Sequence, residues 1–215
     1  MMKHTRNILT TLGLVICLVF FPNCRGKIVT TEDELAEYGW TMYESKDYIE
    51  ARSWFADGIK KDTSYYDNYN GMGWTMGHLR LADSSVYYFE KLLTIDTTFD
   101  EILDIYAGLS FAHNALGNNT EARTYSNIFF GKQNPILDPD WVFDHNSKIN
   151  YLDVRLILAV SEFRLALFEN CQESINKIYK DSGAATVVEV DYTTPAGRSK
   201  LATHLASLQK TLQNS

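Results

Sequence analysis

The chain has 215 residues, of which 45% are hydrophobic, enough for one sizeable core or a short stack of repeats. Its formal net charge is −7 at pH 7 and the sequence shows no basic patch, which argues against nucleic acid as a partner. Only 4 Pro and 12 Gly are present, which argues against long disordered tracts.

Residues 1–23 are expected to be an export signal peptide rather than part of the fold. Lys3, His4 and Arg6 give a basic start, and residues 8–21 form a mostly apolar run of secretory-signal length, short for a membrane span. Cys24 follows directly. This order resembles the signal of bacterial lipoproteins, which ends before a lipidated Cys. The resemblance implies a lipid on Cys24, a tether over residues 24–31 and a place in the bacterial cell envelope.

The residues around Cys24 also set limits on this interpretation. Phe21, Pro22 and Asn23 stand where the lipoprotein pattern has small residues, so two alternatives stay open: an ordinary signal peptide cut nearby, or an uncleaved anchor. Arg25 follows Cys24 instead of the Asp that can retain lipoproteins at the inner membrane. In a Gram-negative host we therefore expect an outer-membrane lipoprotein that faces the periplasm or the surface.

The cysteine count bears on the mature protein. If Cys17 is removed with the signal and Cys24 carries lipid, Cys171 has no partner within the chain. An exported protein with one leftover Cys needs that residue to be inert, so we expect Cys171 to be buried.

The body of the chain contains a repeat with a period of 34 residues. Tyr38-Gly39-Trp40-Thr41-Met42 returns as Met72-Gly73-Trp74-Thr75-Met76, and Phe55 returns as Phe89. Each unit carries two helical patterns. Within the first helix, Leu35, Tyr38, Gly39 and Met42 share one face, and Thr31 with Glu34 has capping-box spacing.

This pattern resembles the tetratricopeptide repeat (TPR) signature W-x2-L-G-x2-Y…A-x3-F in a degenerate form. The resemblance implies an all-α solenoid of helix-turn-helix repeats. We place three repeats at residues 32–65, 66–99 and about 103–136, with three extra residues before the third. Residues 137–215 are interpreted as a degenerate fourth repeat followed by helical C-terminal capping elements.

The C-terminal part is less regular. A strongly apolar helix is expected over residues 151–168, capped by Asp138 or Asp140, and a short second helix carries Ile175 and Ile178. Residues 185–192 are rich in β-formers and are expected to be extended. Thr194 and Pro195 then begin a last helix with a stripe of leucines at 201, 205, 208 and 212, which suits the cap of a solenoid.

No set of residues indicates catalysis or a cofactor. The His residues are far apart in sequence, and there is no His-Glu-x-x-His motif, no paired Cys motif and no phosphate-binding Gly-rich loop. His113 is interpreted as a satisfied structural histidine. Asp138, Asp140, Asp144 and His145 leave a metal site as a minor alternative to helix capping. We therefore expect a protein that is not an enzyme and has no cofactor and no metal.

The TPR resemblance implies a concave groove lined by the first helix of each repeat. Trp40, Trp74 and Phe111 hold the same repeat position, so an aromatic stripe is expected, although they would also suit simple packing against the adjacent repeat. Asp33, Asp67 and Asp104 add negative charge near the rim, which favours a ligand with an apolar run and some basic residues. The expected peptide-binding groove comprises Trp40, Tyr43, Trp74, Asn70, Phe111, Asn114, Asp33, Asp67 and Asp104.

The resemblance thus implies a protein- or peptide-binding scaffold. The Lys, Asn and Arg residues with which some family members clamp a C-terminal carboxylate are missing, which argues against a chaperone-tail partner. With the signal region, the chain also resembles envelope lipoproteins that are accessory subunits of membrane-associated assemblies. The alternative is a cell-surface receptor that binds a glycan or small ligand through groove aromatics.

Overall fold

The computed structural model of the chain describes residues 30–95, 98, 100–132 and 141–213. The predicted export signal, Cys24, Asp138 and Asp140 lie outside these residues. From Thr31 onward, the described residues belong to one compact unit. Among them, no helix is both long enough and apolar enough to cross a membrane.

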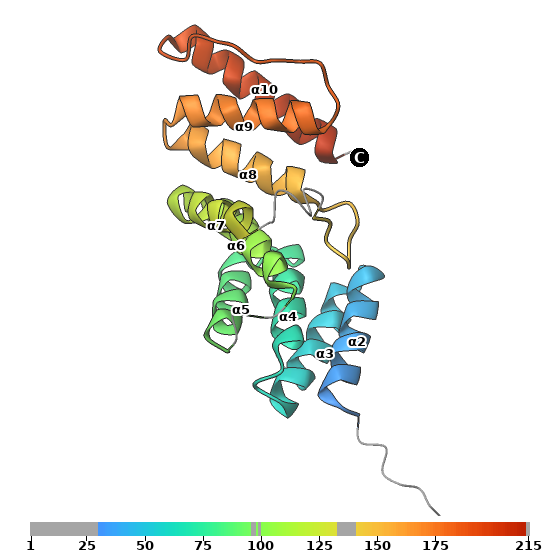
Figure 1. Cartoon of the computed structure of the whole chain (residues 1–215). Helices are drawn as coiled ribbons and strands as arrows, with labels where there is room; N and C mark the ends of the chain where they lie inside the picture. The colour runs from blue at the N-terminus through green and yellow to red at the C-terminus, as the bar shows by residue number, and fades with distance from the viewer. Residues whose placement is uncertain (1–29, 96–97, 99, 133–140, 214–215) are drawn as a thin grey trace, which may run out of the picture. The chain divides into compact units, whose positions relative to one another are not determined.

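The described residues form nine α-helices and contain no β-strand (Figure 1). In chain order the helices are α2 (Glu32–Glu44), α3 (Tyr48–Lys61), α4 (Tyr66–His78), α5 (Ala82–Ile95), α6 (Ile102–Leu116), α7 (Asn119–Lys132), α8 (Tyr151–Arg164), α9 (Phe168–Asp181) and α10 (Pro195–Gln213). One isolated antiparallel bridge joins Val142 to Asn150 in the segment before α8.

The helices stack as consecutive pairs. Helices α2 and α3, α4 and α5, α6 and α7, and α8 and α9 pack against each other, and each second helix also packs against the first helix of the next pair. The first helices α2, α4, α6 and α8 contact their neighbours and form one side of the stack, which we call the first-helix face. This pattern of neighbour contacts is that of an α-solenoid, as the 34-residue period predicts. Helix α10 packs against α8 and α9.

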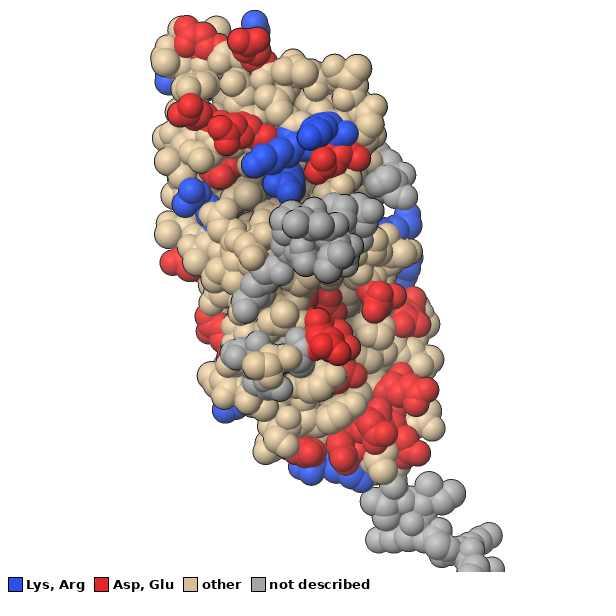
Figure 2. Space-filling view, viewed as in Figure 1, with Lys and Arg blue, Asp and Glu red and all other residues tan. Residues whose placement is uncertain are grey.

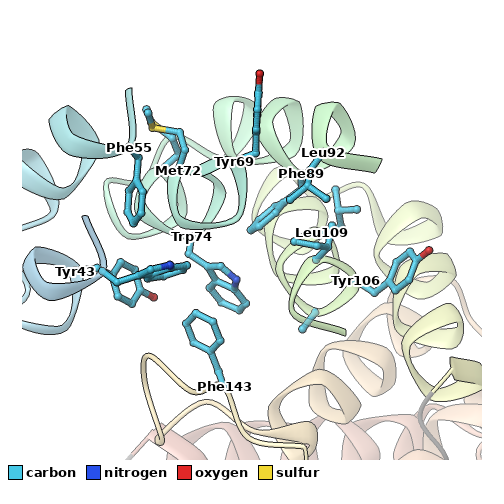
Figure 3. Close-up of a cluster of buried hydrophobic side chains, with 14 of the residues drawn as sticks. Tyr43, Phe55, Tyr69, Met72, Trp74, Phe89, Leu92, Tyr106, Leu109 and Phe143 are labelled. Carbon is cyan, nitrogen blue, oxygen red and sulfur yellow. The ribbon is translucent and has the colours of Figure 1, made fainter. Parts of the chain in front are cut away.

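Buried phenylalanines join the first repeat to the second and the second to the third. Phe55 of α3 lies between Gly39 of α2 and Gly71 of α4, where a Cβ on either glycine would overlap its ring. The glycines therefore allow one aromatic ring to fill the space shared by three helices. The same arrangement returns in the next repeat with Phe89, Gly73 and Gly108. Figure 3 labels the two rings, Phe55 and Phe89.

Two capping boxes set where α2 and α8 begin. Thr31 Oγ1 accepts from the Glu34 amide at 3.4 Å while a Glu34 carboxylate oxygen accepts from the Thr31 amide at 2.8 Å, which confirms the predicted box. For α8 the cap is Asn150, whose partner in the box is Asp153. The prediction that Asp138 or Asp140 caps this helix is therefore wrong.

The expected single helix over residues 151–168 is too long. Helix α8 ends at Arg164, and Ala166 has a φ of 61°, a left-handed conformation that an α-helix does not continue through. Phe168 is the first residue of α9 instead.

The C-terminal elements share a second core. Residues 184–191 form no strand, but the amides of Val188 and Val190 donate to the side chains of Asn176 at 2.6 Å and Gln172 at 2.9 Å on α9. Thr194 caps α10 by accepting from the Gly197 amide at 3.1 Å. Cys171 is fully buried in this core, which confirms its expected burial, and burial raises the pKa of its thiol to about 12.

Candidate functional site

The middle of the first-helix face is covered by the chain itself. Residues 141–150, which we call the strap, form the loop that precedes α8 (Figure 1). The Phe143 amide donates to the Ile149 carbonyl and the Tyr151 amide donates to the Trp141 carbonyl, both at 2.9 Å. A tight turn at Asn146, whose amide donates to the Phe143 carbonyl at 3.0 Å, reverses the chain at the tip of the strap.

Two rings of the strap stack on the repeat tryptophans. The His145 ring lies 3.6 Å from the Trp40 ring, centroid to centroid, and is nearly parallel to it at 3°. The fully buried Phe143 ring lies 4.2 Å from the ring of Trp74 (Figure 3). As a result Trp40 and Trp74 are each only 5% exposed, and the expected aromatic stripe is not open at these positions.

One indole–carboxylate hydrogen bond ties the first two repeats together, and a second ties the strap to the third repeat. Trp40 Nε1 donates to Asp67 of the next repeat at 2.9 Å. By the repeat, with its three extra residues, Trp74 would donate in the same way to Asp104. Asp104 instead accepts from Nε1 of Trp141, on the strap, at 3.0 Å. The buried Trp74 Nε1 finds no acceptor among the described residues.

Burial makes the two acceptor carboxyls hard to ionise. Desolvation raises the pKa of Asp67, although the hydrogen bond from Trp40 opposes the shift. For Asp104 desolvation raises the pKa to about 7 against the hydrogen bonds from Trp141 and Asn70, and the nearby charges of Asp144 and Glu101 add to the rise. These carboxyls lie where negative charge is already concentrated.

On the α2 side of the strap, the first-helix face contains a recess of about 400 Å³, which we call the acidic recess. Its more buried lining includes Asp67, Asp104 and Asn70, and Tyr65 and Tyr66 contribute to its wall. Five exposed carboxylates also line it: Asp33, Glu37, Glu44, Glu101 and Asp144. Acidic side chains also gather over the region of α2 in the space-filling view (Figure 2).

A larger recess of about 680 Å³ lies where the ends of α4 and α6 meet the start of α5, and we call it the apolar recess. Its lining includes the rings of Trp74, Phe89 and Phe111, small residues such as Gly77 and Ala115, and Ile149 of the strap. Small and aromatic side chains with few charged groups suit an apolar side chain of a ligand. The strap therefore contributes lining to both recesses, with His145 in the acidic recess and Ile149 in the apolar one.

The residues expected to form one groove are thus distributed over several places. Trp40, Asn70, Asp33, Asp67 and Asp104 line the acidic recess. Trp74 and Phe111 line the apolar recess, and Asn114 lies with Phe111 in a smaller recess of about 200 Å³ against α8 and α10. Tyr43 lies in none of these three. It is buried, and its hydroxyl lies 2.9 Å from His78 Nε2.

The strap itself was missed as part of this face. One signal was present: Trp141, Phe143 and His145 alternate along the chain, and alternate residues of an extended segment point to the same side. His145 Nδ1 also lies 2.8 Å from a carboxylate oxygen of Glu44 on α2. Of the strap residues, only Asp144 and His145 have a sequence-based interpretation, as helix caps or metal ligands, and neither role suggests docking onto α2.

His113 has the packing role expected of it but is only partly satisfied. It is buried and stacked on Tyr125 with ring centroids 5.4 Å apart, and its Nδ1 lies 3.5 Å from the Asn118 amide nitrogen. Its Nε2 finds no partner among the described residues. Burial lowers the pKa of His113, so the neutral ring is favoured.

Comparison with known proteins identifies the fold. No family model matches the chain, and no curated protein matches its sequence. Among solved structures, YrrB, a TPR protein with an unusual peptide-binding site, has a TM-score of 0.58 at 10% identity, covering 82% of this chain and 86% of its own. A putative kinesin light chain of Podosopora anserina with nearly identical TPR-like repeats has a TM-score of 0.56 at 12% identity, covering 85% and 97%.

A third similar structure, a MamA RS-1 double mutant, has a TM-score of 0.55 at 12% identity, covering 72% of this chain and 78% of its own. At these identities the likeness shows the fold alone. It agrees with the helix pairs, the glycine–phenylalanine contacts and the 34-residue period found here. The described part of the chain is therefore a tetratricopeptide-type α-solenoid.

Proposed function

We propose that the protein is a non-enzymatic scaffold that binds a segment of a partner protein on its first-helix face. The observation that carries this proposal is the pair of recesses that flank the strap, one acidic and one apolar. A segment with an apolar run and a basic residue complements both recesses. The structural likeness to YrrB, whose own peptide-binding site is called unusual, supports peptide binding as a use of this fold.

The strap changes how a ligand would bind. Because Trp40 and Trp74 are covered, a partner segment is expected to contact the two recesses and the strap between them rather than a continuous aromatic groove. The same covering disfavours the alternative of a surface receptor for glycans, since sugars bind by stacking on open aromatic faces. Replacing Trp40 and Trp74 by Ala would also be a poor test, because both are core residues.

The partner is proposed to be a subunit of a membrane-associated assembly in the bacterial envelope. Support for this comes from the basic start, the apolar run and Cys24, which resemble a lipoprotein signal. A lipid on Cys24 would hold the first-helix face near the membrane through the tether, at the outer membrane if the host is Gram-negative. Cys24→Ser should then release the protein from membranes, whereas Cys17→Ser should not, because Cys17 is removed with the signal.

Site-specific photo-crosslinking in intact cells tests the scaffold proposal. A photoreactive amino acid replaces Glu37 in the acidic recess or Ala115 in the apolar recess, both of which are exposed. The control position is Tyr87 on α5, which is 60% exposed and lies in neither recess. The proposal expects one and the same protein to be crosslinked from positions 37 and 115 and not from 87. Crosslinking only from position 87 would contradict it.

A further inference from the structure

The acidic recess has an unusual balance of charge. Seven of its lining residues are Asp or Glu, and none is Lys or Arg. His145 is the one lining residue that can become cationic, and it lies against Glu44 at the rim. The charges of Asp144 and Glu101 raise the pKa of Asp104, so a cation brought by a partner would relieve repulsion among these carboxylates.

The buried part of the recess is prepared for a hydrogen-bond donor. Asn70 lines the recess and is only 2% exposed. Its side-chain amide donates to the Asp104 carboxylate, but its Oδ1 accepts no hydrogen bond from any described residue. A buried acceptor without a donor costs free energy, so a bound group that donates to Asn70 Oδ1 would recover it.

The remaining lining suits a flat cation. Tyr65 and Tyr66 form part of the wall, with ring centroids 5.8 Å apart. A guanidinium group is planar, carries five N–H donors and stacks on aromatic rings. The recess offers several acceptors, namely buried carboxylates, exposed carboxylates and one amide oxygen. A guanidinium group has enough N–H donors to bond to more than one of them at once, whereas an ammonium group is a compact point charge.

We propose that the acidic recess binds the guanidinium group of an arginine side chain from the partner segment. Asp67, Asp104 and Asn70 Oδ1 accept its hydrogen bonds, and the exposed carboxylates around them attract it. This inference rests on the proposed scaffold function, and it specifies that the acidic recess recognises an arginine of the partner segment.

The indole groups next to the recess report its occupancy. Nε1 of Trp40 donates to Asp67 and Nε1 of Trp141 donates to Asp104, so a cation on these carboxylates shifts both indole N–H signals in NMR. Trp54 packs against Tyr38 with the two rings tilted, lies outside the recess and serves as the internal reference. The sample is the full chain labelled with ¹⁵N-tryptophan in a nonionic detergent.

The probe is acetyl-arginine-N-methylamide, and its neutral isostere acetyl-citrulline-N-methylamide is the control ligand. The proposal expects the arginine probe to shift the Trp40 and Trp141 signals saturably, with little change at Trp54 and at least tenfold weaker binding of the citrulline probe. Equal binding of both probes overturns it. Shifts caused by CaCl₂ or spermine but not by the arginine probe also overturn it, in favour of a metal or a free polyamine.

Variants separate local recognition from general charge attraction. Glu37→Gln, Glu101→Gln and Asp144→Asn together neutralise three exposed carboxylates of the recess. The matched control neutralises three exposed carboxylates elsewhere by Glu50→Gln, Glu169→Gln and Glu173→Gln. We expect at least tenfold weaker arginine binding in the first variant and less than twofold in the second. Arginine binding that is weakened equally in both variants overturns the proposed site. Crosslinking from position 115 tests the scaffold function independently of this result.

Discussion

Phe89 and Phe143 are both fully buried aromatic rings of the same core, but different kinds of contact bury them. Phe89 lies between two glycines of neighbouring repeats, and its counterpart Phe55 does the same one repeat earlier. Phe143 has no counterpart in the repeat. It reaches Trp74 from a loop 69 residues further along the chain, by long-range docking alone. The solenoid thus combines a core contact that the first two repeats share with a covering segment that occurs once.

The largest effect is expected from removing a ring of the repeat core. Phe89→Ala leaves a cavity between three helices and should lower the free energy of unfolding by about 3–5 kcal/mol. Gly73→Leu, which forces a side chain into the position of the Phe89 ring, should cost on the order of 1–3 kcal/mol or more. Urea denaturation followed by circular dichroism measures both. Unfolding midpoints equal to wild type would mean that the repeat register is wrong.

Phe143→Ala should destabilise the protein less than Phe89→Ala, although both rings are fully buried. The reason is that the strap can detach while the helix pairs stay folded, which limits the loss to the docking free energy of the strap. Trp74 would then become exposed, and tryptophan emission should shift to longer wavelength. Val142→Ala is the matched control, because Val142 lies on the same strap and is exposed. If Phe143→Ala lowered the free energy of unfolding as much as Phe89→Ala does, the strap would not be separable from the repeat core.

The same contrast explains what the sequence could predict. Three features were visible as local patterns: the period of Gly39 and Phe55, the Thr31–Glu34 cap and the Thr194 cap. Such local patterns predict where helices lie and how neighbouring repeats pack. The strap depends on contacts such as His145 on Trp40 and Trp141 on Asp104, which join residues far apart in sequence and follow no period. The aromatic residues of the groove could therefore be named in advance, but not the fact that the chain covers two of them.

Asp104 should make the stability of the strap region depend on pH. Its pKa is raised from 3.8 to about 7, chiefly by burial. Below pH 3.8 the carboxyl is protonated in both states. As the pH rises toward 7 the unfolded chain loses the proton first, so the group progressively lowers the free energy of unfolding over this window. Asp104→Asn keeps an acceptor for Trp141 but has no proton to lose.

Comparing wild type with Asp104→Asn at pH 5 and pH 8 separates the contribution of Asp104 to the free energy of unfolding from that of the buried histidines. The pKa values of these histidines are lowered by burial. The variant should gain stability relative to wild type on going from pH 5 to pH 8. A difference that stays constant between the two pH values, measured by urea denaturation, would show that Asp104 does not titrate abnormally.

The smallest effect is expected at the rim of the strap. Glu44 lies 2.8 Å from His145 Nδ1, but its side chain is 53% exposed, so solvent screens the pair. Glu44→Gln should change the free energy of unfolding by about 0–1 kcal/mol at pH 6. The stack of His145 on Trp40 should hold the strap in place without this pair. Loss of strap docking in this variant, seen as a red shift of tryptophan emission, would show that the pair is needed.

Amide hydrogen exchange tests most directly the claim that the chain covers its own first-helix face. The amides of Phe143, Asn146, Ile149 and Tyr151 all donate to backbone carbonyls in or beside the strap. The exposed residues 185–187 provide a fast-exchanging reference within the same chain. We predict that peptides spanning residues 141–151 exchange far more slowly than the reference in wild type and approach it in Phe143→Ala, while α4 stays protected. Exchange of this segment at the reference rate in wild type would contradict the account.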